Sequence, residues 1–186
     1  MRPSNPAMMA VSRSLRQNRD RLVEQWSRWV AGRMAQAPHI QRPTIERHLA
    51  LLVDVMIEMA GPLRRQVAEL WFTASDVYGH TAAARGLAAG EVVEELQQLR
   101  ELLIHLLSEM VANLPPRQSM AVVLRLNRLL DRGIAHAVVG YTDALVETLL
   151  NRRGVPIVAS EPAEDEVLQR LEQLEDELAQ LRIKNQ

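Results

Sequence analysis

The sequence predicts an all-α protein: a bundle of about five helices followed by a C-terminal parallel coiled coil. Apolar residues make up 47% of the 186 positions and recur every three or four positions over long segments, which is the period of amphipathic helices. Only 3% of the residues are aromatic, and no long alternation of β-branched and aromatic residues indicates a strand. The final segment repeats apolar residues in heptads.

Proline content divides the chain into four predicted parts. Residues 1–10 contain two prolines and are predicted to form a flexible arm. Residues 11–153 are predicted to form the helical bundle. Residues 154–163 contain two further prolines and are predicted to be a linker. Residues 164–186 are predicted to form a coiled-coil stalk.

Five helices are predicted inside the bundle from their apolar stripes. They cover about 12–36, 43–60, 63–85, 91–112 and 117–152, with ends marked by Pro38, Gly61, Gly86 and Pro115. In the last helix, Gly133 and Gly140 lie seven residues apart on one face. Each glycine costs about 1 kcal/mol relative to alanine in a helix. Close packing of a neighbouring helix against this face would offset the cost.

The C-terminal segment carries the seam of a two-stranded coiled coil. The seam residues are Val167, Leu171, Leu174, Leu178 and Leu181. With Leu171 at position a, Arg170 and Glu177 occupy g positions, whereas Glu175 and Arg182 occupy e positions. In a parallel pair, Arg170 faces Glu175 of the second copy and Glu177 faces Arg182, so both crossings join opposite charges. The segment therefore predicts a homodimer.

The composition excludes several classes of protein. The net charge of −1 gives no overall attraction to nucleic acid or to a membrane surface. The chain has no cysteine, which excludes disulfides and thiolate metal sites. It has no signal-peptide core and no apolar run of about 20 residues. We therefore expect a cytoplasmic protein that binds neither nucleic acid nor membrane.

The first predicted helix is rich in arginine, which raises the alternative of DNA binding. Four of its arginines, Arg13, Arg16, Arg19 and Arg21, do not fall on a single face, and Asp20 and Glu24 interrupt them. No aromatic residues interleave with them to stack on bases. A solvated helix surface is the favoured interpretation.

No motif indicates a reaction or a bound cofactor. The five histidines include no i, i+4 pair, and HExxH, GxSxG and phosphate-binding glycine loops are absent. We therefore expect no enzyme activity, no metal and no cofactor. His105 lies beside the apolar stripe of the fourth helix. A histidine at the edge of the core is favoured over a haem ligand, since the single phenylalanine, Phe72, gives a haem pocket few aromatic walls.

Three further residues are candidates for a site. Trp26 and Trp71 carry much of the aromatic mass, and they either anchor the core or line a ligand pocket or dimer contact. Arg100 lies among apolar positions of the fourth helix, and a charged group near a core needs a partner. Its candidate partners are Asp76, Asp131 and Asp143. In the alternative interpretation, the Arg100 side chain extends along the helix to solvent.

Two stretches of the predicted bundle follow a known family pattern. The first, YGHTAAARGLAAGEVVEELQQLRELLIHLL, runs from Tyr78 to Leu107, with matches at Arg85, Gly86, Glu95, Leu99 and Arg100. The second runs from Asn127 to Leu145, with matches at Asp131 and Tyr141. These stretches resemble the N-terminal domain of the RsbR/RsbRD-type stressosome co-antagonist family. The sequence departs from the family at Leu96, where an aromatic residue is common.

The resemblance covers most of residues 15–150 and implies a globin-like sensory domain without haem. Similar proteins dimerise and pass a signal through a C-terminal helix to a STAS domain or a histidine kinase. We therefore expect a dimeric sensor module that acts on a protein partner or a fused output domain. Two alternatives remain, a standalone structural adaptor that presents helix faces to a partner protein, and a haem- or small-ligand-binding globin-like protein.

Overall fold

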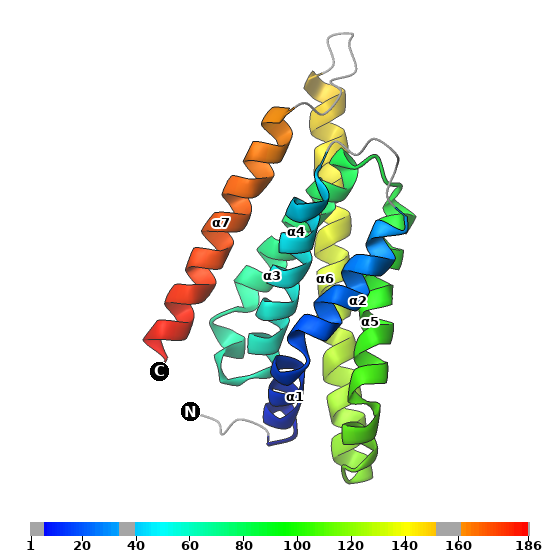
Figure 1. The fold of residues 1–186 in the computed structure, drawn as a ribbon, viewed down its shortest axis with the longest axis vertical. Helices are drawn as coiled ribbons and strands as arrows, with labels where there is room; N and C mark the ends of the chain where they lie inside the picture. Colours follow the sequence, from blue (N-terminus) through cyan, green and yellow to red (C-terminus); the bar gives the residue numbers. More distant parts are fainter. Residues whose placement is uncertain (1–5, 34–39, 152–160, 186) are drawn as a thin grey trace.

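The computed structural model describes residues 6–33, 40–151 and 161–185 (Figure 1). These residues form seven α-helices and one short 3-10 helix, with no strand among them, so the predicted all-α class is confirmed. The elements are α1 (Pro6–Gln17), α2 (Arg19–Ala31), α3 (Arg42–Ala60), η1 (Pro62–Arg65), α4 (Ala68–Ala84), α5 (Ala89–Ala112), α6 (Pro116–Asn151) and α7 (Glu161–Lys184).

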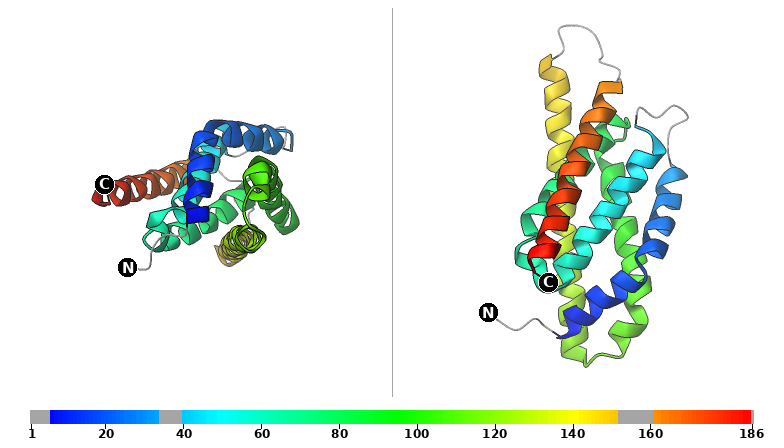
Figure 2. Two further views of the ribbon diagram at one scale, coloured as in Figure 1. Left: turned by 90° about the horizontal axis from the view of Figure 1, so that it is seen from below. Right: turned by 60° about the vertical axis from the view of Figure 1, so that its left-hand side comes forward.

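The helices pack as a bundle, and α6 is 36 residues long. α4 and α5 lie along α6, α1 and α2 pack against α3, and α2 also contacts α5. α7 lies on the outside of the bundle against α3 and α4, and it runs in the same direction as α3 (Figure 1 and Figure 2). The helical bundle is therefore shown, whereas a globin-like arrangement of its helices stays a prediction.

α4 and α6 approach each other closely because glycines face backbone where they cross. A Cβ atom on Gly79 would overlap the carbonyl oxygen of Ala137, and a Cβ atom on Gly140 would overlap the backbone of α4. A Cβ atom on Gly133 would lie 2.5 Å from the ring of Trp71. The close helix packing expected at Gly133 and Gly140 is thus confirmed, and α4 of the same chain supplies it.

The helical part of the chain begins earlier than predicted. α1 starts at Pro6, because proline is tolerated in the first turn of a helix and because Met8 is buried in the core. The predicted flexible arm over residues 1–10 is therefore wrong for residues 6–10. Residues 1–5 lie outside the described part of the chain.

Two predicted helices are each divided in the structure. The first is broken at Asn18, whose side-chain amide donates to the carbonyl of Ser14 at 2.9 Å and ends α1. The third begins as the 3-10 helix η1, and α4 starts only after Val67, whose backbone is not helical (φ −95°, ψ 6°). Both breaks lie at single residues, a side-chain bond at Asn18 and a non-helical backbone at Val67, which apolar periodicity does not detect.

The predicted linker over residues 154–163 overlaps the last helix. α7 begins at Glu161, with Pro162 in its first turn, where the missing N–H of proline leaves no bond unmade. Residues 161–163 are therefore helical rather than linker. Residues 152–160, which contain Pro156, lie outside the described part of the chain.

Candidate functional site

α7 buries its apolar seam against α3 and α4 of the same chain. Four of the five seam residues, Val167, Leu171, Leu174 and Leu178, are at most 8% exposed. The fifth, Leu181, is partly buried and packs against the core. On the opposite side of the helix, Ile183 is 72% exposed. A fully buried leucine contributes about 1.5–3 kcal/mol relative to an exposed one, so this seam holds α7 firmly in place.

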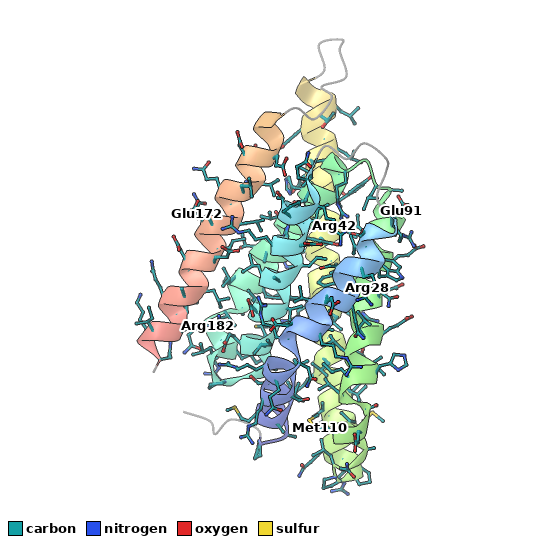
Figure 3. All side chains as sticks on the ribbon, viewed as in Figure 1. Arg28, Arg42, Glu91, Met110, Glu172 and Arg182 are labelled. Atoms are coloured by element: carbon teal, nitrogen blue, oxygen red, sulfur yellow. The ribbon has the colours of Figure 1, made fainter. Side chains whose placement is uncertain are left out.

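Ion pairs and hydrogen bonds set the position of α7 along α3. Arg47 donates to both carboxylate oxygens of Glu175, at 2.8 and 2.6 Å. Nearer the start of α7, the Thr44 hydroxyl donates to Glu164 at 2.6 Å. At the other end of α7, Arg182 reaches toward α3 (Figure 3). We call the α3 residues that make these contacts the docking face; they are Thr44, Arg47, Asp54 and Glu58.

Glu58 of the docking face is shared between the first and last helices. Its side chain is 3% exposed, and one oxygen accepts hydrogen bonds from Arg16 of α1 at 3.0 Å and from Arg182 of α7 at 2.9 Å. Asp54, one turn earlier, is 3.9 Å from Arg182 and is held by two bonds of 2.7 Å from Arg19. A buried carboxylate needs such partners, because an unpaired buried charge is strongly destabilising.

The structure separates the charges that were predicted to pair two α7 helices. The e-position residues, Glu175 and Arg182, have partners on α3. The g-position residues point elsewhere: Arg170 pairs with Glu166 of its own helix at 2.7 Å, and Glu177 is exposed. α7 therefore faces the bundle with its a, d and e positions. Pairing of α7 with a second copy stays a prediction.

A second group of polar residues is buried where α2, α4 and α5 meet. Arg85, just after α4, donates to both carboxylate oxygens of Glu95 at 2.9 and 2.6 Å. The Tyr78 hydroxyl donates to the same carboxylate at 2.5 Å, and the Trp26 indole donates to the Glu95 backbone carbonyl at 2.9 Å. Burial, and then the charge of Glu95, raise the pKa of Tyr78 well above its usual value. The hydroxyl therefore remains a proton donor.

His48 of α3 lies fully buried beside this group. Its ring packs edge-on against Tyr78, with centroids 5.2 Å apart. Nε2 lies 3.0 Å from the carbonyl oxygen of Ala74, which can only accept, so we assign the proton to Nε2. Nδ1 has no hydrogen-bond partner among the described residues. Burial lowers the pKa of His48 to about 4, so the ring is neutral at physiological pH.

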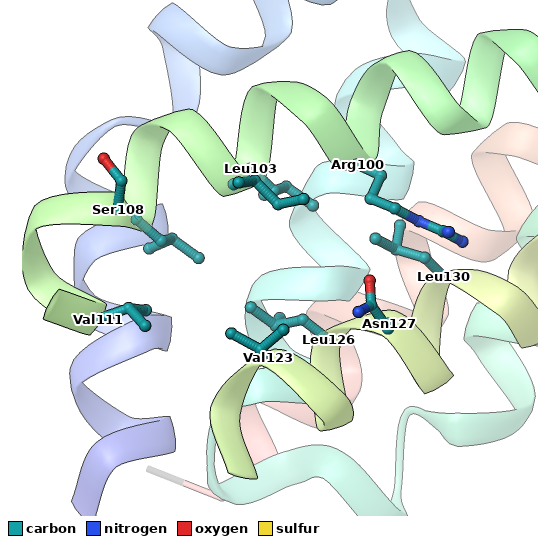
Figure 4. A pocket seen from close by; sticks show the side chains of 10 residues that line it. Arg100, Leu103, Ser108, Val111, Val123, Leu126, Asn127 and Leu130 are labelled. Carbon is teal, nitrogen blue, oxygen red and sulfur yellow. The ribbon is translucent and has the colours of Figure 1, made fainter. Parts of the chain in front are cut away.

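Arg100 of α5 forms an ion pair with Asp131 of α6, one of its three candidate partners. Its guanidinium points across to α6 near Asn127 and Leu130 (Figure 4). The Arg100 side chain is 26% exposed and Asp131 is 60% exposed. Because exposed ion pairs contribute about 0–1 kcal/mol, this pair orients α5 and α6 more than it stabilises them.

An apolar groove lies between α5 and α6 beside Arg100 (Figure 4). Its volume is about 100 Å³, and its walls include Leu103, Leu107, Val111, Val123, Leu126 and Leu130. Ile104, also in the wall, is 56% exposed, and Met120 and Leu124 of α6 are 60% and 47% exposed. This side of the bundle therefore presents an apolar surface to solvent.

The chain matches no protein-family model, no curated protein and no solved structure. Across the described residues, no helix is long and apolar enough to cross a membrane. Nor does the described part of the chain bring together three or more histidine or carboxylate side chains that could hold a metal ion.

The structure does not bring together the three residues considered for a ligand pocket. Trp26 donates to α5, as described above, whereas the buried Trp71 indole donates to the Leu129 carbonyl of α6 at 3.1 Å. His105 is exposed on α5. None of the three lines the groove. Both tryptophans anchor the core, as one of the two interpretations held.

Sequence reasoning missed the docking face and His48. The docking face had a signal: Thr44, Arg47, Asp54 and Glu58 interrupt an apolar helix at positions that share one side. Polar residues at such spacing on a buried helix indicate contact with another charged element. His48 had no comparable signal, because its burial depends on how α3 and α4 pack.

Proposed function

We propose that the chain is a dimeric cytoplasmic signalling module that passes a change in its bundle through α7 to a protein partner or a fused output domain. The observation that carries the proposal is α7 itself. Its seam and e-position charges suit a helix partner, yet it lies on the outside of the bundle. Because α7 is attached by one face, its release exposes its seam and the side chains of α3 and α4 that the seam covers.

The proposed mechanism is a shift of population between states of α7. A change in the bundle that alters the docking face changes the fraction of α7 that is docked. Released α7 pairs in parallel with the α7 of a second copy, as its heptads predict. The sequence resemblance to stressosome co-antagonists supports the same role, since a C-terminal helix carries the signal in those proteins.

Reversing both g-position charges, Arg170→Glu together with Glu177→Arg, tests the pairing. Neither side chain contacts the docking face, and the reversal replaces the Arg170–Glu166 pair of α7 by like charges, so the free energy of unfolding is expected to fall by no more than about 0.5–1 kcal/mol. In the parallel pair, the reversal places like charges against Glu175 and Arg182 of the second copy. We expect the dissociation constant of the dimer, measured by light scattering over a concentration series, to rise several-fold.

The exposed groove between α5 and α6 favours a second candidate function, a structural adaptor that presents helix faces to a partner protein. Large contiguous apolar surfaces on soluble proteins mark interaction sites. If the full chain dimerises and the double reversal leaves the dissociation constant unchanged, the coiled coil is not the interface. That result would favour the adaptor, with the groove at the contact.

A further inference from the structure

α3 takes, within one chain, the place that a second α7 would take in the coiled coil. It runs in the same direction as α7 and, together with α4, covers the same seam. Glu175 meets an arginine in both arrangements: Arg47 when docked, and Arg170 of the second copy when paired. Arg182 likewise meets a glutamate, which is Glu58 when docked and Glu177 of the second copy when paired. The docking face therefore presents an arginine and then a glutamate to α7, in the same order as the predicted partner helix.

The two arrangements cannot exist together on one helix. Leu171 is fully buried and Leu178 is 3% exposed against the bundle, so neither has surface left for a second copy. The carboxylate of Glu175 is likewise engaged by two donor atoms of Arg47. A second α7 can reach the seam only after the first has left α3.

We propose that docking of α7 on α3 is an autoinhibitory contact that masks the dimerisation seam. This inference rests on the proposed function, because it assumes that free α7 helices pair. Release of α7 has two linked effects: the seam becomes available to a second copy, and the docking face is uncovered. The charges of α3 thereby set how much dimer forms at a given concentration.

Arg47→Glu tests the inference without altering α7. It places like charges across the docking contact and leaves the whole seam intact. We expect the dissociation constant of the dimer to fall on the order of tenfold, which corresponds to roughly 1.4 kcal/mol. Arg42→Glu is the matched control, because Arg42 lies on the same helix and pairs with Glu46 rather than with α7. The control is expected to dimerise like the unmodified chain.

Two further variants identify the interface that Arg47→Glu uncovers. Adding Glu175→Arg to Arg47→Glu restores opposite charges between α3 and α7. In the paired state it places the new arginine against Arg170 of the second copy, so the chain is expected to return to monomer. Adding Arg170→Glu and Glu177→Arg instead leaves docking weakened and pairing blocked, so dimer is again expected to be lost. Light scattering of the full chain measures each mass, with circular dichroism as the control for folding.

The possible results separate the inference from the function on which it rests. If Arg47→Glu dimerises no more strongly than Arg42→Glu, while both form the dimer that the g-position reversal weakens, only the inference is overturned. If the Arg47→Glu dimer survives the g-position reversal, another face holds it and the inference is likewise overturned. If no variant dimerises at any concentration, both the inference and the proposed dimer fail.

Discussion

At the scale of single residues, the buried Glu95 carboxylate depends on Arg85 for its counter-charge. Arg85→Met fills a similar volume but leaves the carboxylate with Tyr78 as its side-chain donor. We expect the free energy of unfolding to fall by about 3–5 kcal/mol, the usual effect of breaking a buried ion pair. Urea unfolding measures it. Arg85→Met combined with Glu95→Gln removes both charges but keeps an acceptor for the Tyr78 hydroxyl, so it should recover much of the loss, whereas a fully stable single variant would contradict the role of the pair.

His48 predicts how stability depends on pH. Its folded-state pKa of about 4 lies below the value near 6.5 of an unfolded histidine. As pH falls from about 6.5 to 4, the unfolded chain takes up a proton that the folded chain does not. The contribution of His48 to stability is therefore fully present above pH 6.5 and is lost through this window, by an amount on the order of 3 kcal/mol.

A comparison with His48→Gln isolates this effect from other titrating groups. Glutamine keeps an amide donor for the Ala74 carbonyl but does not titrate. Between pH 6.5 and 4, urea unfolding should show a flatter loss of stability for the variant than for the unmodified chain. Parallel curves would show that His48 does not control the acid side of the profile.

At the scale of elements, the crossing of α4 and α6 depends on Gly79. Gly79→Ala forces the two backbones apart, and overpacking of this kind costs about 1–3 kcal/mol. Gly90→Ala is the matched control, because a Cβ atom there meets open space at the start of α5. That control is expected to gain about 0.4–1 kcal/mol through the unfolded state. Thermal unfolding of both variants checks the prediction, and a stable Gly79→Ala would mean that the crossing adjusts freely.

α3 is surrounded by other helices. It contacts α1, α2, α4 and α7, and 12 of its 19 residues are buried. Its apolar sides belong to the core, whereas its polar side forms the docking face. A displacement of the core-facing side of α3 therefore also moves the docking face, because both belong to the same helix.

At the scale of the whole molecule, the sequence was sufficient for the fold class and for most helix ends. Apolar periodicity and proline are local signals, and they placed α3, α5 and α6 within a few residues. The break at Asn18 was not predicted, because a single asparagine inside a long helical pattern is common. The order in which the helices pack depends on contacts between distant segments, which periodicity does not encode.

Among the contacts of the candidate site, only the ion pair of Arg100 could be predicted from the sequence. A charged residue near the core needs a partner of opposite charge, which left few candidates. Arg100 allowed three aspartates, and the antiparallel arrangement of α5 and α6 selects Asp131. The α7 seam was predicted to pair with a second copy, whereas in the structure it packs against α3 and α4, and the pairing stays a prediction. Its partner was not predictable, since leucine heptads and alternating charges suit α3 and a second α7 equally well.

The carboxylate of Glu58 also bears on the order in which the chain is synthesised. The ribosome completes α1 and α3 long before α7, so Arg16 can neutralise Glu58 during translation. The buried charge of Glu58 is therefore already paired in the nascent bundle before Arg182 is synthesised. Docking of α7 on α3 is therefore the final packing step for the described helices.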